Sequence, residues 1–232
     1  MSVAKSIRES LSPIHPEGYL FIAAFVVATL ILSWLWSPLF WIGAIATAWC
    51  CYFFRDPARV TPLRSDLVVA PADGRVCNVG LVVPPPELGL GPAALPCVSI
   101  FMSVFDCHVN RAPVEGRIRR IAYRPGLFVN ADLDKASEDN ERNGLVIETA
   151  QGDFGVVQIA GLIARRIVCF VREGAHIGAG DRFGLIRFGS RVDVYLPPWA
   201  RIVAGLDSRS VAGETVLAIL SAEEPPRQFR KS

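Results

Sequence analysis

The chain has 232 residues, of which 51% are hydrophobic, and its mean hydropathy of +0.36 is high for a water-soluble protein. Its formal net charge is only +2, and no run of basic residues alternates with aromatic ones, so the composition argues against nucleic acid as a partner. The six cysteines form no Cys-x-x-Cys pair and have no metal-ligand spacing with the three histidines. Neither a disulfide framework nor a metal site is therefore expected.

The excess hydrophobicity lies near the N-terminus, where residues 19–54 contain no charged side chain over 36 positions. A bilayer core is crossed by about 20 helical residues, and a proline disfavours helix in the residue before it. Because Pro38 falls in the middle of the run, a hairpin of two helices is predicted, Tyr19–Trp36 and Pro38–Phe54. The positive-inside tendency then places both flanks in the cytoplasm. The flanking basic residues are Lys5, Arg8, Arg55, Arg59 and Arg64.

Several arrangements of this hairpin are compatible with its length. Its two halves have 18 and 17 residues, which leaves open a full crossing of the bilayer or a shallow, re-entrant insertion. A hairpin buried in the core of a soluble protein is a further alternative. A cleaved signal peptide is disfavoured, because the run is too long and no small-residue cleavage site follows it. Residues 1–56 are therefore expected to anchor the chain, with membrane lipids as partners.

Residues 57–232 have a different texture, with short apolar runs separated by Gly, Pro, Asp and Asn. Such runs, enriched in β-branched residues, are typical of strands, so a mainly β domain of sandwich or barrel-like architecture is predicted. Residues 132–143 are polar and are expected to form a loop, and the tail after Ala222 is expected to fray. The expected strands are Leu67–Ala70, Arg75–Val83, Cys97–Val104, Gly116–Tyr123, Leu145–Thr149, Gly155–Ile159, Arg166–Val171, Phe183–Phe188, Val192–Leu196 and Thr215–Leu220.

Three short motifs in this domain carry reactive residue types. A Pro-Ala-Asp-Gly segment contains Asp73, and by itself it is an ordinary turn. The segment Met102–Gly116 places His108 in a dense polar run, where a histidine is costly to bury without partners. Gly189 precedes Ser190 between two strand-like runs, and a glycine leaves the serine hydroxyl unobstructed as it approaches the preceding carbonyl. Each motif alone is weak evidence for chemistry.

Together with Phe53–Arg59 (Phe-Phe-Arg-Asp-Pro-Ala-Arg), these motifs resemble the phosphatidylserine decarboxylase family in order and spacing, specifically its short membrane-anchored type. The resemblance runs from residue 15 to residue 222. It implies a proenzyme that cuts itself between Gly189 and Ser190 into a large chain, 1–189, and a small chain, 190–232, which stay together as a heterodimer. Ser190 becomes a pyruvoyl group that forms a Schiff base with phosphatidylserine, and carbon dioxide and phosphatidylethanolamine are released. No metal is implied.

The resemblance also implies roles for single residues. His108, oriented by Asp73, is expected to be the base that activates Ser190 for attack on the Gly189 carbonyl. The same histidine is the candidate proton donor in turnover. Longer members of the family carry a second histidine where this chain has Arg111, so His108 serves alone or with Arg111.

Three arginines are candidates for binding the lipid headgroup. They are Arg111, Arg117 and Arg191, and Arg191 stands where the family's maturation site usually has a threonine. A lipid substrate places the expected enzyme at the cell membrane, with the catalytic domain on the cytoplasmic face.

Two alternatives belong to other functional classes. One is a membrane-anchored β-sandwich that binds a partner without catalysis. The other is a serine hydrolase that uses Ser190, His108 and Asp73 directly, although no Gly-x-Ser-x-Gly elbow surrounds the serine. Both alternatives predict one uncut polypeptide, whereas the proenzyme predicts two.

Overall fold

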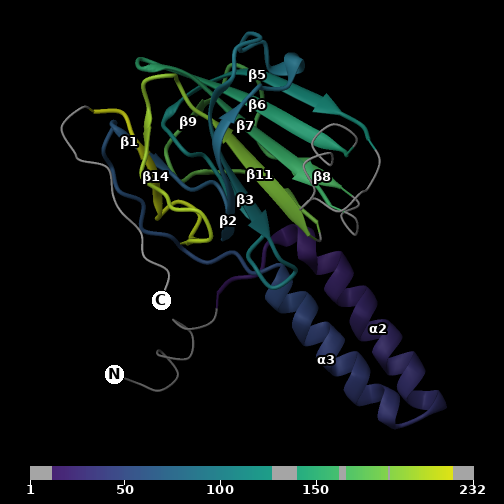
Figure 1. Cartoon of the computed structure of the whole chain (residues 1–232). Helices are drawn as coiled ribbons and strands as arrows, with labels where there is room; N and C mark the ends of the chain where they lie inside the picture. Colours follow the sequence, from purple (N-terminus) through teal and green to yellow (C-terminus); the bar gives the residue numbers. More distant parts are fainter. Residues whose placement is uncertain (1–11, 127–139, 162–165, 188, 222–232) are drawn as a thin grey trace, which may run out of the picture. The chain divides into compact units, whose positions relative to one another are not determined.

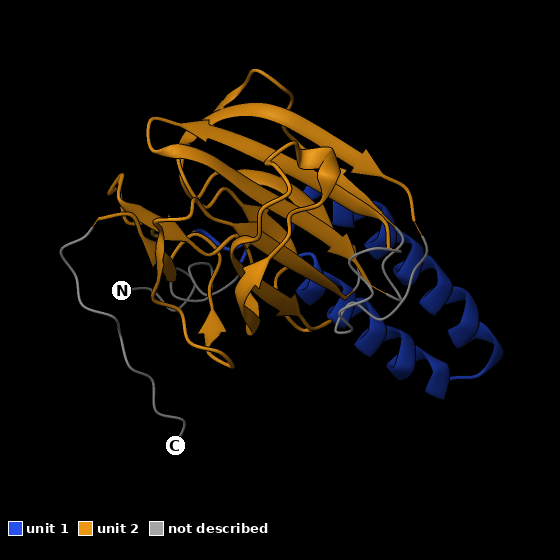
Figure 2. Cartoon of the chain, turned by 45° about the horizontal axis from the view of Figure 1, so that its top comes forward, with its two compact units in different colours: residues 1–58 blue, residues 59–232 orange. Residues whose placement is uncertain are grey.

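The structure is a computed structural model of the whole chain, and it describes residues 12–126, 140–161, 166–187 and 189–221 (Figure 1). The chain divides into two compact units, residues 1–58 and 59–232 (Figure 2). Both described α-helices lie in the first unit, and every named strand lies in the second.

The first unit is a pair of apolar helices, as predicted. A single 3-10 turn, η1 (Pro16–Gly18), leads into α2 (Tyr19–Leu35), and α3 (Pro38–Phe53) follows directly. The break has a local cause: Trp36 is extended, with φ −158°, and Pro38 opens the second helix. Proline fits the first turn of a helix, where its missing N–H would have no intrahelical partner.

Close packing joins the two helices at Gly43. A Cβ on Gly43 would lie 2.3 Å from the hydroxyl of Thr29, so only glycine allows this approach. Small residues at such contacts are typical of helices that pack in membranes. The segment Pro16–Leu35 has 20 residues and is apolar enough to cross a bilayer by length and composition, while Pro38–Phe53 is shorter. Trp34 is 94% exposed, and most apolar side chains of the pair are exposed too.

The second unit is built from antiparallel strands in three sheets (Figure 1). The largest has eight strands in the order β13-β2-β3-β11-β7-β6-β5-β9, and two three-stranded sheets have the orders β1-β14-β12 and β4-β10-β8. The large sheet contains β2 (Gly74–Val82), β3 (Leu95–Met102), β5 (Gly116–Arg124), β6 (Arg142–Thr149), β7 (Gly152–Ala160), β9 (His176–Ile177), β11 (Ser190–Tyr195) and β13 (Arg209–Ser210). The small sheets contain β1 (Leu67–Val69), β4 (Val109–Arg111), β8 (Ile167–Cys169), β10 (Arg182–Ile186), β12 (Arg201–Ile202) and β14 (Val216–Ile219).

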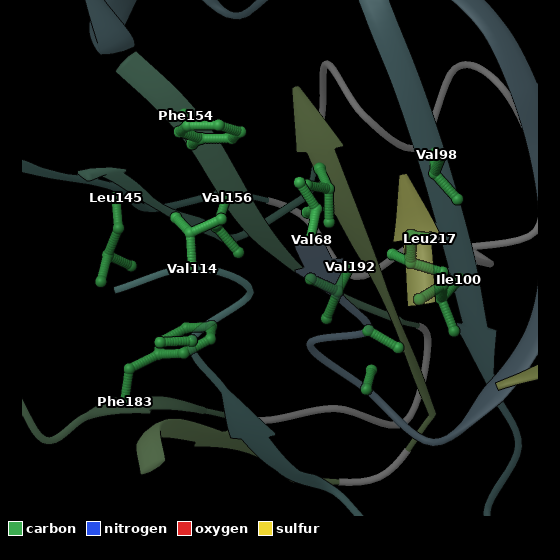
Figure 3. Packing of buried hydrophobic residues seen from close by; sticks show 14 of the residues in the cluster. Val68, Val98, Ile100, Val114, Leu145, Phe154, Val156, Phe183, Val192 and Leu217 are labelled. Atoms are coloured by element: carbon green, nitrogen blue, oxygen red, sulfur yellow. The ribbon is translucent and has the colours of Figure 1, made fainter. Parts of the chain in front are cut away.

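One hydrophobic core lies between the large sheet and the small ones. Figure 3 shows Ile100, Val156 and Val192, from β3, β7 and β11, within this core together with Phe154 and Phe183. Side chains alternate between the two faces of a strand. On β11 the core face therefore carries Ser190, Val192 and Val194, and the opposite face carries the residues between them.

The opposite face of β11 is buried as well, under a second cluster that includes Leu88 of the 3-10 turn η2 (Pro86–Leu88). A strand covered on both faces must satisfy every polar side chain it carries. Arg191 and Asp193 do so by pairing with each other through two contacts of 2.9 and 3.0 Å. The pKa of the Cys97 thiol and that of the Tyr195 hydroxyl are raised, mainly by burial and secondly by the nearby Asp193 carboxylate. Both groups therefore stay neutral beside the Arg191–Asp193 ion pair.

The mainly β fold with an N-terminal apolar helix pair is confirmed, and a strand lies at each of the ten expected places. Four strands of two or three residues, β4, β9, β12 and β13, were not expected. The loop predicted over residues 132–143 was wrong at its C-terminal end, because Arg142 and Asn143 already belong to β6. Residues 132–139 and the tail after Ala222 lie outside the described residues.

Candidate active site

Ser190 begins the central strand of the large sheet. It pairs with Met102 of β3 on one side and with Ala160 of β7 on the other. Its side chain is fully buried, and its hydroxyl lies 3.5 Å from the Met102 sulfur. The hydroxyl of Ser190 is therefore shielded from bulk solvent in the uncut chain.

Gly189 is held through both of its backbone polar groups. Its N–H donates to Nε2 of His108 at 3.3 Å, and its carbonyl oxygen accepts from the N–H of Gly161 at 2.9 Å. Its φ is +66°, in the left-handed region that favours glycine. The turn into β11 therefore explains the glycine, and it leaves the carbonyl preceding Ser190 in a defined place.

His108 lies between β3 and β4 and is fully buried. Its Nδ1 is 3.0 Å from the main-chain carbonyl of Asp106. Because a carbonyl oxygen only accepts hydrogen bonds, Nδ1 carries the proton, and Nε2 presents a lone pair to the N–H of Gly189. The imidazole is thus neutral and faces the Gly189-Ser190 segment with its basic nitrogen.

The segment that carries His108 is fixed by the Asp106 side chain. One carboxylate oxygen accepts from the N–H and the hydroxyl of Ser103, both at 2.8 Å. The other oxygen accepts from Arg209 at 2.8 Å. Asp106 is buried, so these contacts together with its main-chain carbonyl determine where the imidazole lies. Sequence reasoning missed this residue, although its spacing to Ser103 is that of a hydrogen-bonded turn.

Asp73 does not orient His108 in this structure, contrary to the expectation. One oxygen of its carboxylate pairs with Arg59 at 2.6 Å, and the other accepts from the N–H of Ala212 at 2.8 Å. The orienting contact of His108 comes instead from the Asp106 carbonyl. Asp73 therefore joins two expected motifs, its own turn and the Phe53–Arg59 segment.

The three candidate arginines are spread over three strands. Arg111 on β4 is buried and donates to the carbonyl of Gly180 at 2.8 Å. Arg117 lies on β5, three strands away from β11 in the large sheet, and donates to the carbonyl of Gly174 at 3.3 Å. Arg191 is engaged with Asp193 on the face of β11 opposite Ser190. The structure does not gather them into one headgroup site.

A chain of buried amides ends at Met102, whose sulfur also contacts the Ser190 hydroxyl. Asn143 donates to Gln158 at 3.0 Å, and Gln158 donates to Asn110 at 2.8 Å. The Asn110 amide nitrogen has only long contacts, 3.5 Å to the Pro71 carbonyl and 3.6 Å to the sulfur of Met102. Its donor capacity is therefore poorly used next to Met102. Gln158 offered a signal in the sequence, since it is a polar residue within an apolar strand.

Within the described residues, no three His, Cys, Asp or Glu side chains lie close enough together to hold a metal ion. None of the six cysteines, all within the described residues, is joined in a disulfide.

Comparison with known proteins shows the family to which the chain belongs. The family model for phosphatidylserine decarboxylase matches residues 46–218, so the chain belongs to the phosphatidylserine decarboxylase family. A curated relative from Beijerinckia indica subsp. indica, named phosphatidylserine decarboxylase proenzyme, is 64% identical over 230 residues, covering 99% of each chain. The match includes both units of the structure and every residue of the candidate site.

Proposed function

We propose that the chain is a proenzyme that cuts itself between Gly189 and Ser190, and that the cut form decarboxylates phosphatidylserine at a membrane. The close relative's name, phosphatidylserine decarboxylase proenzyme, supports this function. The observation that carries the cut is the environment of Ser190: a fully buried hydroxyl next to a carbonyl held by Gly161, with the basic nitrogen of His108 on the adjoining amide.

The cut begins when the Ser190 hydroxyl adds to the Gly189 carbonyl carbon. Nε2 of His108 takes the hydroxyl proton and returns it to the Ser190 nitrogen as the peptide bond breaks, which leaves an ester. Loss of the Ser190 α-proton then expels the Gly189 carboxylate and leaves a dehydroalanine, and water releases its nitrogen as ammonia. Serine has thereby become pyruvoyl without any outside oxidant.

The residues around position 190 fit such a group. It is made from atoms already in place, against Met102, whose sulfur also contacts the underused Asn110 amide. At this position a pyruvoyl group would supply a carbonyl for the substrate amine and would take up the electron pair left on the substrate carbon when carbon dioxide departs. His108 would supply a proton to the decarboxylated carbon, and the buried surroundings would keep bulk water away.

The two chains would remain a heterodimer after the cut. The small chain, 190–232, supplies β11, β12, β13 and β14, and β11 is hydrogen-bonded to β3 and β7 of the large chain along its whole length. Residues 1–56 would anchor the enzyme in the cell membrane. The basic residues on both sides of the helix pair favour a cytoplasmic catalytic unit.

Intact-mass measurement of the purified protein tests the proposal. We expect two chains, 1–189 and 190–232, with the small chain lighter by one ammonia than the unmodified peptide and blocked at its N-terminus. Ser190→Ala should give one uncut, inactive chain, while alanine at the exposed Ser65, as a control, should leave the cut intact. Conversion of phosphatidylserine vesicles to phosphatidylethanolamine and carbon dioxide tests the substrate.

The same measurement separates the alternatives. A binding scaffold would stay a single unmodified chain. A serine hydrolase would also stay uncut and should react with a fluorophosphonate probe. A single unmodified polypeptide in an active preparation would refute the pyruvoyl mechanism.

A further inference from the structure

The carbonyl of Gly189 receives a hydrogen bond whose placement is chemically specific. Gly161 directly follows β7, and its N–H donates to this oxygen at 2.9 Å. Among the described residues it is the one donor to that oxygen. The carbonyl is the group that Ser190 must attack in the proposed cut, so Gly161 contacts a reacting atom.

In a regular antiparallel pair of strands this hydrogen bond would be one of two between Gly189 and Gly161, and here only this one forms. Ser190 pairs with Ala160, so Gly189 and Gly161 would be the next pair along the two strands. Two residues in such an antiparallel position normally exchange two hydrogen bonds. Here the N–H of Gly189 turns to His108 instead, and its φ of +66° takes the backbone out of the strand conformation. The hydrogen bond from the Gly161 N–H to the Gly189 carbonyl therefore remains, whereas the bond expected from the Gly189 N–H to Gly161 is replaced by the one to His108.

Negative charge develops on this one oxygen in two successive steps. As the Ser190 hydroxyl adds to the carbonyl carbon, the carbon–oxygen π electrons move onto the Gly189 oxygen. When the ester is later eliminated, the leaving group is the Gly189 carboxylate, which contains the same oxygen. A fixed N–H aimed at it lowers the barrier of both steps, since a preorganised donor needs no reorientation as charge appears.

We infer that the main-chain N–H of Gly161 is the oxyanion donor of the self-cleavage reaction, working opposite His108 on the two sides of the Gly189-Ser190 segment. The inference rests on the proposed function and assigns a catalytic group to it.

Replacing Gly161 by proline removes the N–H, whereas replacing it by alanine keeps it. Ala160 ends a β-strand, and an extended residue is the one that tolerates a following proline. The rate of cutting is measured by pulse-chase in cell-free translation with detergent, following the full chain and the 1–189 fragment on denaturing gels. Loss of one oxyanion donor should make Gly161→Pro cut at least about 100-fold more slowly than Gly161→Ala.

The controls keep each outcome decisive. The uncut Gly161→Pro chain should melt at the same temperature as uncut Ser190→Ala, which shows that the β unit is folded. If the melting temperatures differ, glycolate is incorporated at position 161 instead, which replaces only the N–H by an ester oxygen. Glycine incorporated at the same position by the same suppressor tRNA is the matched control. Equal cutting rates with and without the N–H would overturn the inference while leaving the proenzyme proposal intact. A wild-type chain that never cuts would instead remove the proposed function itself.

Discussion

At the scale of single residues, the contacts of His108 determine its protonation state. A ring nitrogen that faces a carbonyl must donate, and one that faces an N–H must accept, so the imidazole between Asp106 and Gly189 has one neutral form that satisfies both neighbours. This form carries its lone pair on the side of the Gly189-Ser190 segment. In the uncut chain the imidazole is therefore in the state that the proposed base needs in order to accept the serine proton.

Replacing this base should slow the cut without unfolding the chain. We expect His108→Ala to cut at least about 100-fold more slowly than the wild type, because general-base catalysis typically contributes two to four orders of magnitude. The matched control is His176→Ala: His176 is exposed and lies 3.5 Å from Glu115 on the surface, so its loss should leave the rate unchanged. Pulse-chase of the full chain measures both variants. A wild-type rate in His108→Ala would remove His108 as the base.

The sequence indicated some of these residues and could not indicate others. Gly189, Ser190 and His108 were expected at one site because the motifs that contain them together resemble a known family. Gly161 and the carbonyl of Asp106 act through main-chain groups that every non-proline residue possesses, so no residue type marks them. Only the register of β7 against β11 and the course of the backbone after β3 bring these groups to the site.

At the scale of elements, the segment between β3 and β4 depends on one buried carboxylate. Asp106 accepts two hydrogen bonds from Ser103 and one from Arg209, whose side chain is 71% exposed. These contacts contribute differently to stability. An exposed ion-pair partner contributes little, whereas a donor removed from solvent and left without its acceptor destabilises the fold. The segment should therefore be sensitive to the loss of the carboxylate and tolerant of the loss of the arginine.

Comparing the two alanine variants tests this difference. In the uncut Ser190→Ala background, Asp106→Ala should lower the free energy of unfolding by about 2 kcal/mol, because the half-buried donors of Ser103 lose the buried carboxylate that accepts from them. Arg209→Ala should lower it by less than about 1 kcal/mol. Denaturant titration followed by circular dichroism gives both values, and cutting rates in the wild-type background show whether His108 is displaced. Equal destabilisation by the two variants would contradict this account of the segment.

Strands were predictable from the sequence where they were long enough to show a run of apolar residues. The strands of five or more residues show apolar runs in the sequence, whereas β9, β12 and β13 have two residues each and no periodicity to detect. The start of β6 was missed for a different reason. Arg142 and Asn143 look like loop residues, but in the fold Arg142 pairs with Glu87 and Asn143 donates to Gln158. Tertiary partners decide the conformation of such residues, and these come from distant parts of the chain.

At the scale of the whole molecule, the proposed cut falls at the start of the most central strand. β11 lies between β3 and β7, which come from sequence positions 95–102 and 152–160. This interleaving was not predictable from the sequence, because local patterns do not specify which strands pair. It has a consequence for the mature enzyme: a strand with both edges paired and both faces buried holds the small chain by backbone hydrogen bonds and core contacts together.

Fractionation of the cut enzyme tests anchoring and association together. Membranes containing it are washed with high salt, with alkaline carbonate or with urea, and both chains are followed on denaturing gels. Among the described residues, the helix of membrane-spanning length lies in the large chain, so this chain should stay in the pellet after salt and carbonate. The small chain should stay there after salt, because β11 remains paired with β3 and β7, and should be released by urea, which unfolds the β unit. Release of the small chain by salt alone would show that β11 does not hold it to the large chain. Release of the large chain by carbonate would show that the helix pair is not inserted in the bilayer.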